Sequence, residues 1–478
     1  MEHDHSHNIR IDESVNIGGY MQPDQIWGIL NEVKPPDQEE LDSILETARA
    51  LRGLDDRQLA ALLAITDAGM MEQMFQAARE VKQTVYGKRV VFFAPLYLSN
   101  YCTNNCLYCG FRHDNKDLTR THLEPEQIRE EVAVLLAEGH KRLLLVAGED
   151  PRKSSIEYLE EAISAVYGTH TEDGEIRRVN VNAAPMTVED FRRLKACGIG
   201  TYQIFQETYH PETYKYVHPS GKKADYLWRL TALDRAIEAG IDDVGIGPLF
   251  GLYDFRYECL ALLSHIRYLE AKFGIGPHTI SIPRLEPALN APVAVEPPHP
   301  VSDTDFRKIV AALRLAVPYT GMILSTREQA DLRDELFALG ISQISAGSCT
   351  SPGAYKKKAQ HAPEAEQFEI GDTRSLAELI ETLSEKGYIP SFCTACYRLE
   401  RTGDRFMSLA KAGDIGHMCL PNAIISFQEY LLDHATPEAR EAGERLIDEQ
   451  LEELPETHRQ RVRLMLDALR EGKRDLYV

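Results

Sequence analysis

Apolar and polar positions divide the chain into a helical beginning and a long alternation of strands and helices. Before residue 85, apolar residues such as Leu41, Ile44 and Leu45 recur at helix-like intervals. From residue 89 onward, short runs rich in β-branched and aromatic residues alternate with stretches of helix length. The eight runs are RVVFFAPLY (89–97), RLLLVAG (142–148), RVNVN (178–182), TYQIF (201–205), DDVGIG (242–247), HTISIP (278–283), TGMILST (320–326) and SQISAG (342–347).

Eight successive strand–helix units predict a parallel sheet closed into a (βα)8 barrel. An open, doubly wound sheet is the alternative, but the number of consecutive units favours closure. One intervening stretch shows the helix signals clearly, since it begins with Pro125 and is followed by Gly139. We therefore expect an α/β fold with a helical extension over residues 1–85, the barrel over 86–350 and a mainly helical region over 351–478.

Charge and composition exclude some partners. The chain has 53 Lys and Arg residues against 74 Asp and Glu residues, a formal net charge of −21. Because nucleic-acid binding requires a basic face, no nucleic-acid partner is expected. The first ten residues contain no apolar stretch that resembles a signal peptide, and the uncharged run from Val90 to Phe111 holds too many polar residues to span a membrane. We expect a cytoplasmic protein without membrane contact.

Six of the nine cysteines fall into two groups, which indicates metal or redox chemistry rather than disulfides. The first group, Cys102, Cys106 and Cys109, has the spacing C-x3-C-x2-C and directly follows the first predicted strand. A loop can wrap three such thiolates around an iron–sulfur cube and leave one iron without a protein ligand. A zinc site with His113 as the fourth ligand is the alternative.

The first cysteine segment resembles the signature of the radical S-adenosylmethionine (SAM) superfamily, including the aromatic Tyr108 before the last cysteine. The resemblance implies a 4Fe–4S cluster that binds SAM, cleaves it with one electron and yields a 5′-deoxyadenosyl radical that abstracts hydrogen. Gly148 and Glu149 resemble the segment that receives the SAM amino group. Glu207 and Arg256 are expected to contact the ribose and carboxylate of SAM. A rim or helix-end ion pair is the alternative for both.

The second group, Cys393, Cys396 and Cys419, has the spacing C-x2-C-x22-C. Spacing alone allows an auxiliary 4Fe–4S cluster or a zinc site with His417. A radical SAM barrel followed by this motif resembles the HydG family, the tyrosine lyases of FeFe-hydrogenase maturation. Further similar segments are LYLSNYC (96–102), FQETYH (205–210), GIGPLFGL (245–252), PRLEPA (283–288) and LSTRE (324–328). Many of these segments also resemble 2-iminoacetate synthase, which lacks the extended C-terminal cysteine region.

The resemblance implies that hydrogen is removed from the amino group of tyrosine and that the Cα–Cβ bond then breaks, which releases p-cresol and dehydroglycine. The fragment would become carbon monoxide and cyanide on an additional iron at the second cluster. His265 is the residue that matches the family's histidine ligand of that iron, with a core histidine as the alternative. Arg327 is the expected anchor of the tyrosine carboxylate, with Ser345 and Tyr97 in the same pocket. Barrel packing or a rim ion pair is the alternative for these three residues.

The resemblance also implies partners: an electron donor such as ferredoxin or flavodoxin, and a hydrogenase maturation scaffold protein. Two other functions remain open. A 2-iminoacetate synthase would share the first half-reaction, whereas a non-catalytic iron–sulfur scaffold would have no reason to cleave SAM.

Overall fold

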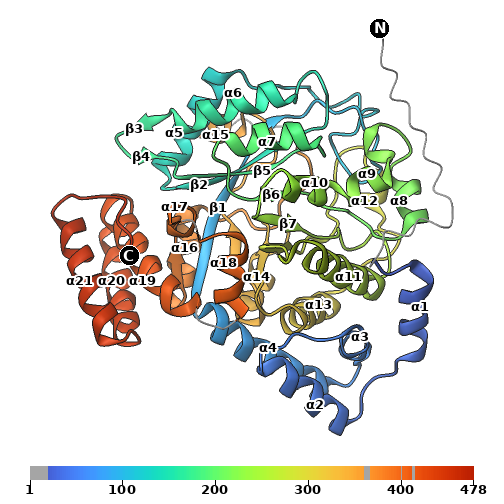
Figure 1. The fold of residues 1–478 in the computed structure, drawn as a ribbon. Helices are drawn as coiled ribbons and strands as arrows, with labels where there is room; N and C mark the ends of the chain where they lie inside the picture. The colour runs from blue at the N-terminus through green and yellow to red at the C-terminus, as the bar shows by residue number, and fades with distance from the viewer. Residues whose placement is uncertain (1–19, 360–365, 400, 412–414) are drawn as a thin grey trace.

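The computed structural model describes residues 20–359, 366–399, 401–411 and 415–478 (Figure 1). Eight parallel strands pair side by side in chain order, and the last pairs with the first, with Phe92 opposite Ile344. The sheet is therefore closed, which confirms the predicted (βα)8 barrel. The strands are β1 (Arg89–Ser99), β2 (Arg142–Ala147), β5 (Arg178–Asn182), β6 (Tyr202–Gln203), β7 (Val244–Ile246), β8 (Thr279–Ser281), β9 (Gly321–Leu324) and β10 (Gln343–Ser345).

Helices follow the strands and form the outer layer. Side-chain caps fix where several of them begin; for example, Ser155 accepts a hydrogen bond from the backbone of Tyr158 at the start of α6. The longer outer helices are α5 (Pro125–Ala137), α6 (Ile156–Tyr167), α7 (Val188–Ala196), α10 (Ala232–Glu238), α11 (Phe255–Phe273), α13 (Asp303–Ala316), α14 (Ala330–Leu339) and α16 (Leu376–Glu385). Shorter elements are the β3–β4 hairpin (His170–Thr171, Gly174–Glu175), α8 (Pro211–Val217), the 3-10 turn η1 (Lys222–Ala224), α9 (Tyr226–Leu230), α12 (Pro292–Val295) and α15 (Ala354–Ala359).

The N-terminal extension is helical, as predicted. It consists of α1 (Pro23–Glu32), α2 (Gln38–Arg49), α3 (Asp56–Ala64) and α4 (Ala68–Tyr86), drawn in blue in Figure 1; residues 1–19 lie outside the described part. The apolar positions that predicted these helices, among them Leu41 and Leu45, are buried. Because α4 packs on α13 and α14, the extension adds a second layer of helices over one side of the barrel.

The C-terminal region begins with a strand that joins the barrel sheet. Strand β11 (Ile389–Ser391) pairs with the first residues of β1, and Val91 has Ser391 on one side and Gln343 on the other. The helices α17 (Ala395–Arg398), α18 (Gly403–Lys411), α19 (Ile415–Asp433), α20 (Pro437–Glu452) and α21 (Glu456–Arg470) follow, and the last three lie together at the left of Figure 1. The pairing of β11 brings Cys393 to the N-terminal end of the barrel.

The long strand β1 lines two separate cavities, one at each end of the barrel. Val91 lines the cavity at the N-terminal end of the strands, called the floor cavity here, and Phe93 lines the cavity at the C-terminal end, called the mouth cavity. Two other strands show the same division. The floor cavity is lined by Gly321 on β9 and Gln343 on β10, and the mouth cavity by Ile323 and Ser345 on the same strands. Residues two apart on a strand differ by about 7 Å in height, so one layer of side chains separates the cavities.

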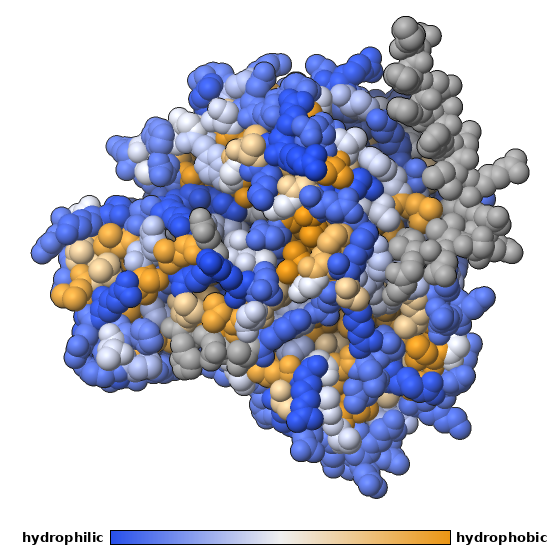
Figure 2. Space-filling model, viewed as in Figure 1, coloured by the Kyte–Doolittle hydropathy of each residue, from blue (hydrophilic) through white to orange (hydrophobic). Residues whose placement is uncertain are grey.

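The surface of the molecule is mainly hydrophilic on the face shown in Figure 2, with smaller hydrophobic areas between polar ones. Among the described residues, no helix is both long and apolar enough to cross a membrane.

Candidate active site

The mouth cavity, of about 200 Å³, gathers most of the predicted site residues. They come from the loops after different strands, as expected when parallel strands present their carboxyl ends at one rim. The predicted residues that line it are Tyr97, Cys102, Cys106, Tyr108, Cys109, Gly148, Glu149, Glu207, Arg327 and Ser345.

The three cysteines of the first group share one loop between β1 and α5. The loop turns tightly where the backbone N of Cys109 donates to the O of Cys106, at 3.3 Å. Burial raises the pKa of the Cys102 thiol to about 12 and also raises the pKa of Cys106 and Cys109. Without a metal these thiols stay protonated, and a bound cluster would hold them as thiolates. Three cysteines that line an open cavity, with Cys106 buried and the other two half-buried, suit a cluster with one free iron.

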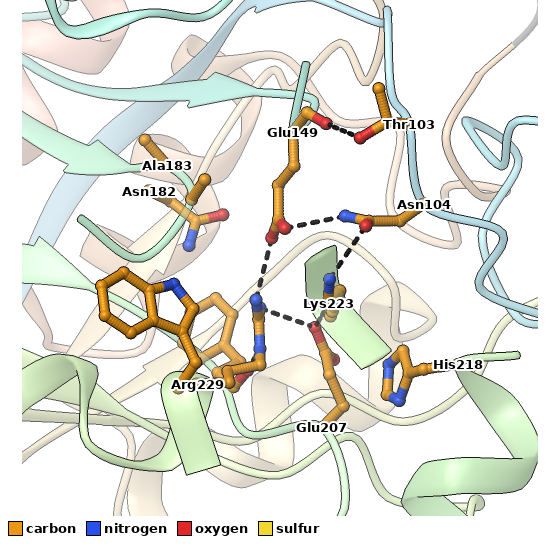
Figure 3. A network of polar contacts seen from close by, with 12 residues as sticks. Thr103, Asn104, Glu149, Asn182, Ala183, Glu207, His218, Lys223 and Arg229 are labelled. Carbon is orange, nitrogen blue, oxygen red and sulfur yellow. Dashed lines mark hydrogen bonds and ion pairs between the residues drawn. The ribbon is translucent and has the colours of Figure 1, made fainter. Parts of the chain in front are cut away.

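A buried network of charges lies beside the cysteine loop (Figure 3). The carboxylate of Glu149 accepts a hydrogen bond from Nδ2 of Asn104 at 2.7 Å and forms an ion pair with Arg229 at 2.8 Å. Arg229 also reaches Glu207 at 3.4 Å, and Lys223 pairs with the same Glu207 oxygen at 2.6 Å. Burial opposes ionisation of Glu149, but Arg229 and Lys223 outweigh it and lower the pKa of that carboxyl. The network holds the Glu149 carboxylate ionised at the cavity wall and keeps Glu207 beside it.

Gly148 lets the loops after β1 and β2 approach each other. Its backbone N donates to the O of Ser99 at 2.8 Å, and a Cβ added at this position would lie 2.4 Å from the carbonyl oxygen of Tyr101. Only glycine fits, because the nearest atom belongs to the backbone and cannot swing away. The neighbouring carbonyl of Glu149 accepts hydrogen bonds from the backbone and side chain of Thr103. The predicted Gly-Glu segment is thus locked against the cysteine loop.

Tyr97, Arg327 and Ser345 line the mouth cavity. The guanidinium of Arg327 lies 3.3 Å from the centre of the Phe368 ring. It has no carboxylate partner within the described residues, and burial lowers its pKa. The hydroxyl of Ser345 is buried without a hydrogen-bond partner in the described part of the chain. A half-buried cation and an unsatisfied hydroxyl that line the same cavity suit a small ligand that carries a carboxylate.

Arg256 corrects one sequence-based assignment. It lies in the first turn of α11, where its side chain is 43% exposed and pairs with the helix-capping Asp254 at 2.6 Å. Arg256 does not line the mouth cavity. The structure contains instead the alternative named above, an ion pair at a helix end. The cation beside Glu149 and Glu207 is Arg229 instead.

The second cysteine group lies at the other end of the barrel. Cys393, Cys396 and Cys419 line the floor cavity, which also contains Arg89 and His278. The thiol of Cys396 donates to Cys419 and lowers the pKa of the Cys419 thiol, and the nearby guanidinium of Arg89 acts in the same direction. Three sulfurs surrounded by positive charge fit an anionic cluster. The side chain of His417, the alternative zinc ligand, lies outside the described residues.

His265 does not lie beside the second cysteine group, which corrects its assignment as an iron ligand. It is buried in the outer helix α11, where Nδ1 contacts the hydroxyl of Tyr209 at 3.2 Å and the ring packs edge-on against Tyr20. Burial lowers its pKa to about 4. The histidine of the floor cavity is His278, at the start of β8. Its Nδ1 is buried without a hydrogen-bond partner in the described part of the chain.

Sequence reasoning missed Asn104, Lys223, Arg229 and His278. Lys223 and Arg229 lie in short helical turns after β6, and no motif marks them. The position of His278 could have been predicted, because this residue immediately precedes β8 and therefore lies at the floor end of the barrel. Among the described residues, no three His, Cys, Asp or Glu side chains are arranged to hold a single metal ion. A four-iron cube is larger, and its thiolates stand farther apart than the ligands of a single ion.

Two family models match the chain across the barrel. The model described as Radical SAM superfamily matches residues 96–260, which include the cysteine loop, Glu149 and Glu207. The model described as Biotin and Thiamin Synthesis associated domain matches residues 281–389. Fold and mouth site together define a radical SAM enzyme, and this class implies a 4Fe–4S cluster and SAM.

Individual relatives refine the class. The 2-iminoacetate synthase of Salmonella typhimurium is 34% identical over 348 residues, 72% of this chain and 89% of that protein. A solved HydG structure, described as a maturase of the FeFe-hydrogenase, is 50% identical, has a TM-score of 0.93 and is matched over 100% of its length and 96% of this chain. For HydG from Carboxydothermus hydrogenoformans the identity is 45%, the TM-score 0.81, and the match covers 93% of this chain and 97% of that one. The chain therefore belongs to the HydG family of radical SAM proteins.

Proposed function

We propose that this chain is a tyrosine lyase of FeFe-hydrogenase maturation. It cleaves the Cα–Cβ bond of tyrosine to p-cresol and dehydroglycine, and it converts the fragment to carbon monoxide and cyanide on iron that serves as cargo. The observation that carries the proposal is the second cysteine group, which lines its own cavity at the opposite end of the same barrel. The near full-length similarity to HydG maturases supports this assignment.

The mouth residues have separate tasks in this proposal. Cys102, Cys106 and Cys109 hold the 4Fe–4S cluster, and the cluster with SAM supplies a carbon radical when reduced. Tyr108, whose hydroxyl hydrogen-bonds His218 at 2.7 Å, closes the wall beside the cysteines. Glu149 and Glu207, both paired with Arg229, offer acceptors to the ammonium and ribose hydroxyls of SAM.

Tyrosine would bind between the cysteine loop and the ends of β9 and β10. Arg327 is a half-buried cation that forms no ion pair with a carboxylate in the described part of the chain, so it is the proposed anchor of the substrate carboxylate. The free hydroxyl of Ser345 offers a further hydrogen bond, and Tyr97 lines the same wall.

The floor residues would hold the auxiliary 4Fe–4S cluster and the additional iron. Cys393, Cys396 and Cys419 are the proposed cluster ligands, and His278 replaces His265 as the proposed ligand of the extra iron. Nδ1 of His278 is buried and makes no hydrogen bond among the described residues, with an Asp243 oxygen 3.9 Å away, and such an imidazole nitrogen is suited to iron. The proposed partners are an electron donor such as ferredoxin or flavodoxin and a maturation scaffold protein that receives the iron cargo.

Product analysis tests the proposal against 2-iminoacetate synthase. The reconstituted, reduced protein is incubated anaerobically with SAM and tyrosine. We expect 5′-deoxyadenosine, p-cresol and carbon monoxide trapped by a haem protein. Formation of p-cresol without carbon monoxide would favour 2-iminoacetate synthase. Intact SAM would contradict both enzymes and favour the iron–sulfur scaffold.

A further inference from the structure

A short segment outside the helices and strands crosses the barrel mouth beside the first cysteine group. Residues 366–369, called the mouth strap here, are fixed by backbone hydrogen bonds. Gln367 N donates to Thr350 O, and Gly110 N donates to Gln367 O, both at 3.1 Å; Glu369 N donates to Pro287 O at 2.9 Å. The strap is therefore anchored to three separate loops of the mouth.

The close approach of the strap to the cysteine loop depends on Gly110, the residue after Cys109. A Cβ at this position would lie 2.8 Å from the carbonyl oxygen of Glu366 and 3.0 Å from that of Gln367. Because Gly110 has no side chain, the backbone of the strap can contact the cysteine loop directly after Cys109.

The side chain of Gln367 connects a cysteine to the cavity wall. Its Oε1 accepts a hydrogen bond from the hydroxyl of Tyr97 at 2.7 Å, and its Nε2 donates to Sγ of Cys109 at 3.6 Å. A metal-bound cysteine sulfur accepts hydrogen bonds and cannot donate them. When a cluster is bound, the amide of Gln367 must therefore point its Nε2, and not its Oε1, toward Cys109. Tyr97 therefore fixes the direction in which Gln367 points its N–H.

We propose that Gln367 is a positioning residue that tunes the reduction potential of the mouth cluster through Cys109, with Tyr97 holding its amide in place. A hydrogen bond to a ligand sulfur stabilises the more negative, reduced cluster and so raises its reduction potential. Because Tyr97 also lines the substrate cavity, the same amide connects that cavity with the cluster. The inference rests on the cluster assigned under the proposed function.

A redox titration monitored by EPR tests this role on the full-length, reconstituted protein. The mouth cluster is identified as the signal that changes when SAM is added. We expect Gln367→Leu and Gln367→Glu to make its midpoint potential more negative, and Tyr97→Phe to do so by a smaller amount. The matched control is Ser348→Ala, which changes the same cavity at a hydroxyl that makes no hydrogen bond to a cysteine of the first group, and it should leave the potential unchanged.

A spectroscopic readout separates the hydrogen bond from a general change of polarity. Electron–nuclear double resonance of the reduced mouth cluster should show an exchangeable proton coupling that Gln367→Leu loses and Ser348→Ala keeps. An unchanged coupling or an unchanged potential in Gln367→Leu would overturn the role of Gln367. If that variant fails to assemble a cluster, Gln367→Glu, which keeps the shape of the side chain, decides by the same two readouts. A wild-type protein without a SAM-responsive cluster would instead overturn the proposed function.

Discussion

At the scale of single residues, Arg229 is the side chain on which the mouth network depends. Its guanidinium is 4% exposed and bridges the carboxylates of Glu149 and Glu207. Removal of one member of a buried ion pair leaves an uncompensated charge, whereas exposed pairs contribute little. We therefore expect Glu149 and Glu207, the proposed acceptors for SAM, to keep their positions only while Arg229 is present.

We predict that Arg229→Met lowers the free energy of unfolding by about 3–5 kcal/mol, the usual cost of breaking a buried pair. Arg256→Met is the matched control, because Arg256 pairs with Asp254 at the surface, and it should cost less than about 1 kcal/mol. Urea unfolding of both variants measures the difference. Equal losses would contradict the central place of Arg229 in the network.

At the scale of elements, loop contacts that glycine permits shape the mouth. Gly148→Ala should destabilise the protein by about 1–3 kcal/mol, because the added methyl group overlaps the Tyr101 carbonyl and forces the loops apart. The control is Gly28→Ala in α1, where a Cβ meets nothing within 4 Å. That change should stabilise the helix by about 0.5–1 kcal/mol. Thermal unfolding compares the two, and loss of stability in both would refute the steric argument.

Helix α11 holds the turn after β6 through Glu258, which accepts hydrogen bonds from Thr208 and from the backbone of Tyr209. Burial raises the pKa of Glu258 from 4.5 to about 8. Between these two values the folded protein keeps a proton that the unfolded chain has lost, so stability falls as the pH rises from about 4.5 and levels off above about 8. We predict that Glu258→Gln reduces this fall in the free energy of unfolding.

Urea unfolding at a series of pH values from about 5 to about 9 checks the prediction for Glu258. The control is Glu126→Gln on the exposed surface of α5, which should keep the pH dependence of the wild type. An identical slope in wild type and Glu258→Gln would show that Glu258 titrates alike in the folded and unfolded chain.

The elements of the barrel could be predicted because strands and helices carry their periodicity locally. The cysteines, Gly148 and Glu149 could be predicted because short motifs mark them at strand ends. Arg229 and Lys223 could not, since their role depends on how irregular turns after β6 fold back to Glu207. The assignment of His265 rests on the family resemblance alone, and His278, which immediately precedes β8, is the histidine that lies at the floor.

At the scale of the whole molecule, the barrel separates two cysteine-lined cavities by one layer of side chains. Strand β1 spans this layer, with Val91 at the floor and Phe93 at the mouth. Strand β11 brings the C-terminal cysteines to the floor by pairing with the start of β1. Chemistry at the mouth and chemistry at the floor can therefore be removed independently.

Iron content and EPR of the anaerobically reconstituted protein test this separation most directly, in wild type and in a variant with Cys393, Cys396 and Cys419 changed to Ala. The account predicts that the variant loses the iron of the floor centre, keeps one 4Fe–4S cluster whose EPR signal responds to SAM, and still forms 5′-deoxyadenosine. A variant that retains the full iron content of the wild type would contradict the presence of two centres in this chain.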